Sequence, residues 1–120
     1  MLIPLRNYSH YSICESNIKI DDLIDHAVKE KFKAIALTDY RLLSGALEFS
    51  IKAYKNGILP IIGLDVDYVD SLNRSFRLTL LSKNLKGYSN LCKLSSDINT
   101  NSDFKLTISN IKNYSSGLVL

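Results

Sequence analysis

A run of four apolar residues, Ala34-Ile35-Ala36-Leu37, places the tightest limit on the fold of this chain. Polar residues bound the run on both sides, and it is too short for a helix of its own. Such a run is typical of a strand that is buried on both faces of a sheet. A helix pattern that opens at Ile20-Asp21-Asp22 precedes it, and a second helix is expected over about residues 44–54, with Gly57 as its C-cap. A buried strand between two helices predicts an α/β protein.

The rest of the chain continues this alternation. Strands are expected over residues 59–68, 76–81 and 117–120, and helices over about 85–98 and 108–114, with a turn at 70–74 and a polar loop at 100–103. Strands that alternate with helices imply parallel β/α units, here about four of them. A closed barrel needs about seven or eight such units, so the pattern predicts an incomplete barrel that ends before it closes.

Charge and composition exclude several classes of protein. The net charge is +3 and the pI is about 8.8, but the lysines are spread along the chain and form no dense basic stripe for tracking phosphates. No apolar run reaches the ~20 residues of a membrane span, and the first residues do not resemble a secretory signal, so a cytoplasmic location is expected. Cys14 and Cys92 form no CxxC motif and are interpreted as bystanders.

Several sequence blocks follow one another in a fixed order along the chain. They include ALTDY at 36–40 and GILPIIGLDV at 57–66, and the full set is 5–12, 18–23, 34–40, 44–49, 57–66, 78–84 and 87–91. In this order they resemble the PHP domain that opens the alpha subunit of bacterial DNA polymerase III. The resemblance implies a PHP-type (β/α) barrel of which residues 1–120 form the N-terminal part. It also implies a parent protein that is a DNA-directed DNA polymerase acting in DNA replication.

The resemblance breaks at the metal ligands. Active members of the wider family hold a metal cluster with histidines and carboxylates, and the corresponding positions here are Arg6, Tyr8, Glu15, Asp39, Tyr40, Asp65 and Arg77. Arginine cannot ligate a metal because it stays protonated and offers no lone pair. We therefore expect no catalytic, metal-binding or cofactor-binding residue in this segment. Arg6 and Arg77 either pair with Asp39 or Asp65 in place of the metals or point into solvent.

Two functions remain open at this stage. The first is a non-catalytic structural and interaction module. Its partners would be the remaining polymerase domains, a proofreading subunit, and DNA through the parent enzyme. The parent polymerase would use Mg²⁺, but this segment would bind no cofactor. The second is a metal-dependent phosphoesterase or 3′-5′ proofreading exonuclease with non-standard ligands drawn from His10, Glu15, Asp39 and Asp65. His10 and His26 are otherwise expected to be ordinary surface or partly buried side chains. A different PHP parent, such as a histidinol-phosphate phosphatase, is disfavoured by the block at 80–91.

Overall fold

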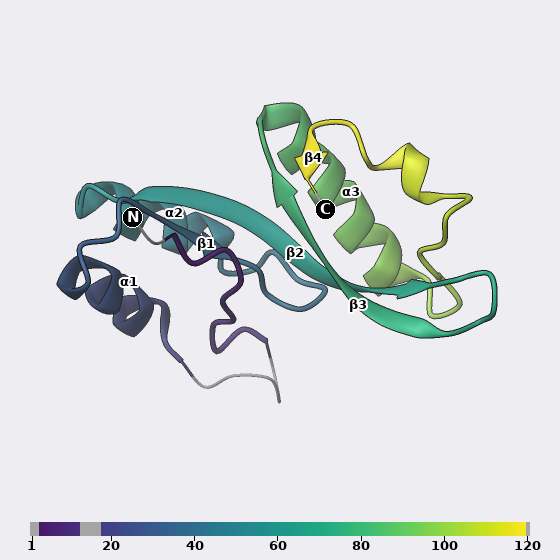
Figure 1. Ribbon diagram of the computed structural model, residues 1–120, viewed down its shortest axis with the longest axis horizontal. Coiled ribbons are helices and arrows are strands. Elements are labelled where there is room, and N and C mark those ends of the chain that lie inside the picture. The colour runs from purple at the N-terminus through teal and green to yellow at the C-terminus, as the bar shows by residue number, and fades with distance from the viewer. Residues whose placement is uncertain (1–2, 13–17, 120) are drawn as a thin grey trace.

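The computed structural model describes residues 3–12 and 18–119 (Figure 1). Helices and strands alternate along the first half of the chain, and a strand pair and a longer helix follow. The elements are α1 (Ile20–Lys29), β1 (Ala34–Leu37), α2 (Ala46–Lys55), β2 (Leu59–Val69), β3 (Ser75–Ser82), α3 (Leu85–Thr100), the 3₁₀ helix η1 (Ile111–Asn113) and β4 (Leu118–Val119). The predicted helix over 108–114 is therefore only one short 3₁₀ turn.

The four strands form one open sheet in the order β1-β2-β3-β4. The α/β class and the incomplete barrel are confirmed, but the expectation of parallel β/α units holds only for β1-α2-β2. β2 pairs with β3 antiparallel, and β3 pairs with β4 antiparallel. The connection between β2 and β3 is a tight turn in which Asn73 has a positive φ of 62°. Such a turn reverses the chain, whereas a parallel partner needs a crossover of a dozen or more residues.

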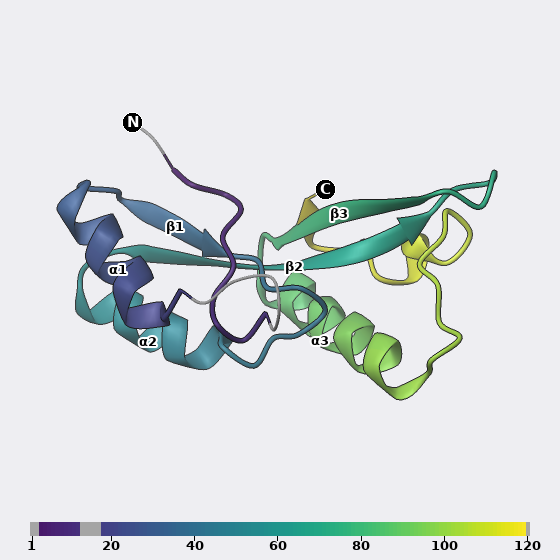
Figure 2. The same cartoon turned by 90° about the horizontal axis from the view of Figure 1, so that it is seen from below.

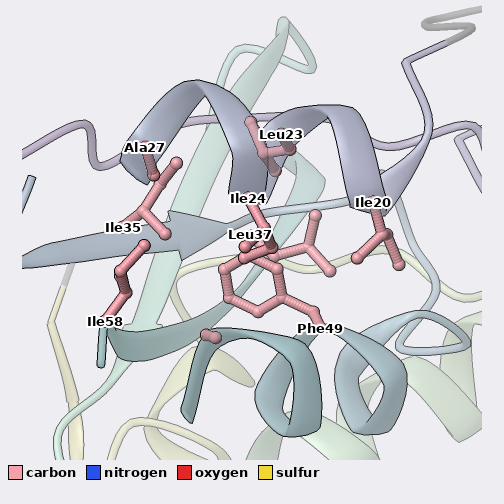
Figure 3. Packing of buried hydrophobic residues seen from close by; sticks show 9 residues of the cluster. Ile20, Leu23, Ile24, Ala27, Ile35, Leu37, Phe49 and Ile58 are labelled. Carbon is pink, nitrogen blue, oxygen red and sulfur yellow. The ribbon is translucent and has the colours of Figure 1, made fainter. Parts of the chain in front are cut away.

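All three α-helices lie on one side of the sheet (Figure 2). Helices α1 and α2 pack on β1 through a cluster that includes Ile24, Ile35 and Phe49 (Figure 3). Helix α3 packs on β2 and β3 through a second cluster that includes Leu64 and Leu80. Side chains alternate between the two faces of a strand, so the residues between these positions point to the side without helices.

Local signals explain where the helices begin and end. Helix α1 ends at Lys29, before Lys31 takes up a left-handed conformation with φ of 60°. The C-cap of α2 is Asn56, one residue before the predicted Gly57, and Gly57 follows it with φ of 71°, which glycine adopts without steric cost. At the start of α3 the Asn84 side chain accepts a hydrogen bond from the Gly87 amide at 2.9 Å.

The N-terminal segment runs along the free edge of β1. The carbonyl of Pro4 accepts a hydrogen bond from the Ala36 amide at 3.0 Å, and the carbonyl of Asn7 accepts one from the Thr38 amide at 2.8 Å. The Asn7 side chain also donates to the Ala36 carbonyl at 2.9 Å. These bonds fix the beginning of the N-terminal segment against the sheet. They bring Arg6 and Tyr8 to the carboxyl end of β1.

Candidate functional site

The candidate site is built around Asp65, a buried carboxylate in the middle of β2. Its neighbours Leu64 and Val66 point toward α3, so Asp65 points to the side of the sheet without helices. Antiparallel pairing places Thr79 of β3 directly opposite Asp65, and Arg77 opposite Asp67. The Asp65 side chain is fully shielded from solvent. A charge buried in this way requires partners that neutralise it and satisfy its hydrogen bonds.

The partners of Asp65 come from the N-terminal segment and from β3. A terminal nitrogen of Arg6 lies 2.9 Å from Oδ2 of Asp65, and the Tyr8 hydroxyl donates to the same oxygen. The Thr79 hydroxyl donates to Oδ1, and Nη1 of Arg77 lies 3.7 Å from Oδ2. Of the two alternatives left open for the arginines, the structure shows pairing and not solvent exposure alone, and the carboxylate that they share is Asp65.

Tyr40, Asp67 and Arg77 extend this cluster toward the turn of the β2–β3 hairpin. The Tyr40 hydroxyl donates to Asp67, and Nε of Arg77 lies 3.5 Å from an oxygen of the same carboxylate. The guanidinium of Arg77 stacks 3.9 Å from the centre of the Tyr40 ring, a cation–π contact. Sequence analysis did not single out Asp67. The period of two along β2, which puts Asp67 on the same face as Asp65, was the signal that could have found it.

Asp39 is separate from this cluster, and the donors that bond its carboxylate among the described residues are neutral. Its carboxylate accepts hydrogen bonds from the Ser9 amide at 2.6 Å, the Ser9 hydroxyl at 2.7 Å and the Ser12 hydroxyl at 2.8 Å. Asp39, Ser9 and Ser12 are all buried. Among the described residues no lysine or arginine forms a salt bridge with Asp39. This carboxylate therefore fixes the N-terminal loop rather than completing the charge cluster.

The contacts of the cluster raise the pKa values of three of its side chains, Arg6, Tyr8 and Tyr40. The hydrogen bond and the charge of Asp65 raise the pKa of the Arg6 guanidinium above its usual value. Burial raises the pKa of the Tyr8 hydroxyl, and the hydrogen bond to Asp65 raises it further. Burial followed by the bond to Asp67 raises the pKa of Tyr40 in the same way. Both tyrosines therefore remain hydrogen-bond donors, and the arginines remain cations.

These residues do not suit a cluster of divalent metal ions. Such ions need several converging imidazole or carboxylate ligands with free lone pairs. Here guanidinium and phenol groups converge on Asp65, and hydroxyls occupy Asp39. Within residues 3–12 and 18–119, no group of three or more His, Cys, Asp and Glu side chains is placed to hold a metal ion. Glu15 lies outside the described residues.

The two histidines lie on the surface, as expected. His10 is exposed and stacks on Tyr11, with ring centres 4.4 Å apart. His26 is exposed on α1 and contacts the edge of Phe32, with ring centres 5.9 Å apart. Neither imidazole lies among the partners of Asp39 or Asp65 in the described part of the chain.

Comparison with known proteins adds a family and a set of relatives. Residues 4–120 match the PHP domain. The chain is 39% identical over 106 residues to the DNA polymerase III subunit alpha of Ureaplasma parvum, an alignment that covers 88% of this chain and 10% of that protein. It is 38% identical over 104 residues to the subunit of the same name from Rickettsia prowazekii, covering 87% of this chain and 9% of that protein. The chain thus spans about a tenth of the length of the curated relatives that it matches.

Two solved structures share the fold. An amidohydrolase from Chromobacterium violaceum, with bound sulfate and no metal, superposes with a TM-score of 0.64 at 23% identity, covering 78% of this chain and 32% of that one. A putative metal-dependent phosphoesterase from Bifidobacterium adolescentis superposes with a TM-score of 0.63 at 12% identity, covering 93% of this chain and 43% of that one. At these identities the likeness extends to the fold alone.

Proposed function

This chain belongs to the PHP domain family, and from that membership we propose that it is the N-terminal part of the PHP domain of a replicative DNA polymerase alpha subunit. We propose further that it acts there as a structural and interaction module and not as a phosphoesterase. The names of the curated relatives support the first part of the proposal. The parent enzyme would then be a DNA-directed DNA polymerase in DNA replication, with nucleotidyl transfer and its Mg²⁺ located elsewhere in the protein.

The observation that carries the non-catalytic role is the set of partners around Asp65. Two guanidinium groups supply positive charge to a carboxylate that, in the family pattern, would serve metal ions. The hydroxyls of Tyr8 and Thr79 also donate hydrogen bonds to the two oxygens of this carboxylate. A metal ion would have to displace these donors and lie beside two fixed cations, which Coulomb repulsion strongly opposes. The same contacts join the N-terminal segment to β2 and β3, which is a structural role.

The proposed partners follow from the proposed parent. They are the remaining domains of the alpha subunit, a proofreading subunit, and DNA through the complete polymerase. The proposed location is the cytoplasm. Within the described residues no helix is both long and apolar enough to cross a membrane.

Metal binding and turnover together test this proposal. The purified chain is titrated with Mn²⁺ and Zn²⁺ by calorimetry and then assayed on p-nitrophenyl phosphate and on single-stranded DNA. We expect no saturable metal binding and no turnover above that of an Asp65→Asn variant. The matched comparison is a triple variant, Arg6→His, Tyr8→His and Tyr40→His, which supplies the missing imidazoles and should bind metal more tightly than the natural chain.

Two results would contradict the proposal. One is stoichiometric binding of Mn²⁺ or Zn²⁺ by the natural chain. The other is metal-dependent hydrolysis that Asp39→Asn or Asp65→Asn abolishes while circular dichroism shows that the variants stay folded. Either result would favour the phosphoesterase or exonuclease interpretation, with ligands other than those of the family pattern.

A further inference from the structure

A small cleft of about 240 Å³ lies beside the charge cluster, at the edge of β2. The loop after β1 forms one wall, and the segment after α3, which runs back along the distal half of β2, forms another (Figure 1). The polar residues of its lining are Arg41, Asp67, Ser102 and Lys105. None of them is a position at which the family pattern places a metal ligand.

The cleft exists because two segments leave a gap along one edge of β2. The Asp65 amide donates to the Asp39 carbonyl at 3.0 Å, and the Arg41 amide donates to the Asp65 carbonyl at 2.9 Å. Farther along the same edge, the Val69 amide donates to the Leu106 carbonyl at 2.9 Å. Because alternate residues of a strand present their amides to the same edge, the Asp67 amide points into the gap between these two pairings.

Asp65 and Val69 direct their amides to this edge and not to β3, so the Asp67 amide between them also faces away from β3, and no hydrogen bond from it to a segment at this edge is found among the described residues. The Asp67 amide lacks a described partner at this edge because the chain turns away from β2 at Arg41. With φ of 63° at Arg41 the chain turns away from β2, and the Arg41 carbonyl accepts bonds from Ser95 and Asn99 of α3, each at 2.8 Å. That carbonyl would otherwise have continued the ladder to Asp67. The Asp67 amide is therefore a backbone hydrogen-bond donor that points into the cleft.

Two cations accompany this donor. Neither Arg41 nor Lys105 forms a salt bridge with a carboxylate in the part of the chain that the structure describes. The guanidinium of Arg41 uses one terminal nitrogen in a 3.4 Å contact with the Ile98 carbonyl near the end of α3, which leaves most of its five donors available. The Asp67 carboxylate does not neutralise them, since Tyr40 and Arg77 already contact it.

We propose that this cleft binds an oxyanion of the phosphate class. Guanidinium, ammonium, a serine hydroxyl and an unpaired backbone amide are the donors that proteins use to hold phosphate. The volume lies below the ~300 Å³ at which pockets for whole drug-sized ligands begin, so the cleft holds a phosphate group rather than an entire nucleotide. The phosphate group belongs either to a free or terminal phosphate or to a nucleic-acid phosphodiester.

The proposal is tested by titrating the ¹⁵N-labelled chain with inorganic phosphate at constant ionic strength, and in a second arm with a short single-stranded oligodeoxynucleotide that lacks terminal phosphates. The Asp67 amide should show a saturable shift with phosphate, with a dissociation constant on the order of 1 mM. Lys105→Ala should weaken binding about tenfold, the loss expected for one charge-assisted hydrogen bond. Lys29→Ala on α1 removes the same charge from an exposed site away from the cleft and should leave binding unchanged.

Arg41→Gln should weaken binding further, and because Arg41 also contacts α3, its fold is checked by circular dichroism. Lys105 is exposed, so the Lys105→Ala result stands even where Arg41→Gln unfolds the chain. Binding of phosphate alone assigns the cleft to a free or terminal phosphate, and binding of the oligonucleotide as well assigns it to a phosphodiester. The proposal is overturned when the Asp67 amide does not move, when neither probe saturates, or when Lys105→Ala and Lys29→Ala weaken binding equally.

Discussion

The Thr79→Val substitution removes one hydroxyl from the Asp65 cluster and preserves the shape of the side chain. Thr79 is the described partner of Oδ1 of Asp65, while Arg6 and Tyr8 bond to Oδ2. The variant therefore leaves one oxygen of a fully buried carboxylate without its donor. A hydrogen bond to a charged group contributes about 1.5–3 kcal/mol, so the free energy of unfolding should fall by about that amount.

Urea unfolding followed by circular dichroism measures this loss. A small domain has an m-value of about 1–3 kcal/mol/M in urea, so the unfolding midpoint should fall by about 1 M. Thr100→Val is the matched control, since its exposed hydroxyl donates to the Ser96 carbonyl at 2.7 Å at the end of α3. That control should stay within about 0.5 kcal/mol of the natural chain.

A double-mutant cycle with Asp65→Asn tests whether the negative charge of Asp65 causes the loss of stability in Thr79→Val. With a neutral amide at position 65, the cost of Thr79→Val should fall to about 1 kcal/mol, the value for a neutral hydrogen bond. An equal cost in both backgrounds would refute the reasoning. So would a Thr79→Val variant that is as stable as Thr100→Val, because the Asp65 cluster would then contribute little to the fold.

Three further predictions concern other parts of the molecule. Burial and a hydrogen bond to a carboxylate of α3 raise the pKa of Tyr114 from 10.0 to about 12. Because the folded state holds this proton more tightly than the unfolded state, the free energy of unfolding should decline between pH 10 and pH 12. Tyr114→Phe should remove that decline when the urea midpoint is measured as a function of pH. Gly87→Ala should lower the free energy of unfolding by about 2 kcal/mol, measured by urea unfolding, because a Cβ there would lie 2.0 Å from the Gly117 carbonyl oxygen. Ser12→Ala should lower it by about 1–3 kcal/mol in the same assay, since it removes a hydroxyl donor from the buried Asp39.

The sequence was sufficient for the elements whose signals are local. The run Ala34–Leu37 is a fully buried strand, and Gly57 has a positive φ just after the end of α2, one residue beyond the C-cap Asn56. The direction of β3 was not obtained, because alternation of strands and helices was given more weight than the short turn that ends β2. That turn is a local signal, and it could have indicated that β3 runs antiparallel to β2.

The candidate site was predictable in part. A family pattern could place Arg6, Asp65 and Arg77 in one region, and the structure brings them within salt-bridge distance. Asp39 matched the same pattern, yet serine hydroxyls surround it, and no periodicity indicates that they fold back over it. The cleft at Asp67 could not be predicted from the sequence, because it depends on the positive φ of Arg41 and on where the segment after α3 returns to β2.

The buried carboxylate of Asp65 and the two arginines beside it are physically linked. Asp65 is held in the sheet with no exposure to solvent, and such a carboxylate is costly wherever positive charge is absent. Small apolar residues at positions 6 and 77 would leave the Asp65 carboxylate buried without a cation beside it. Arg6 and Arg77 avoid that cost, and each long side chain keeps its charged end partly in water, with 56% and 30% of the side chain exposed. Asp65 and the two arginines therefore depend on one another, which explains why this face of the sheet is polar.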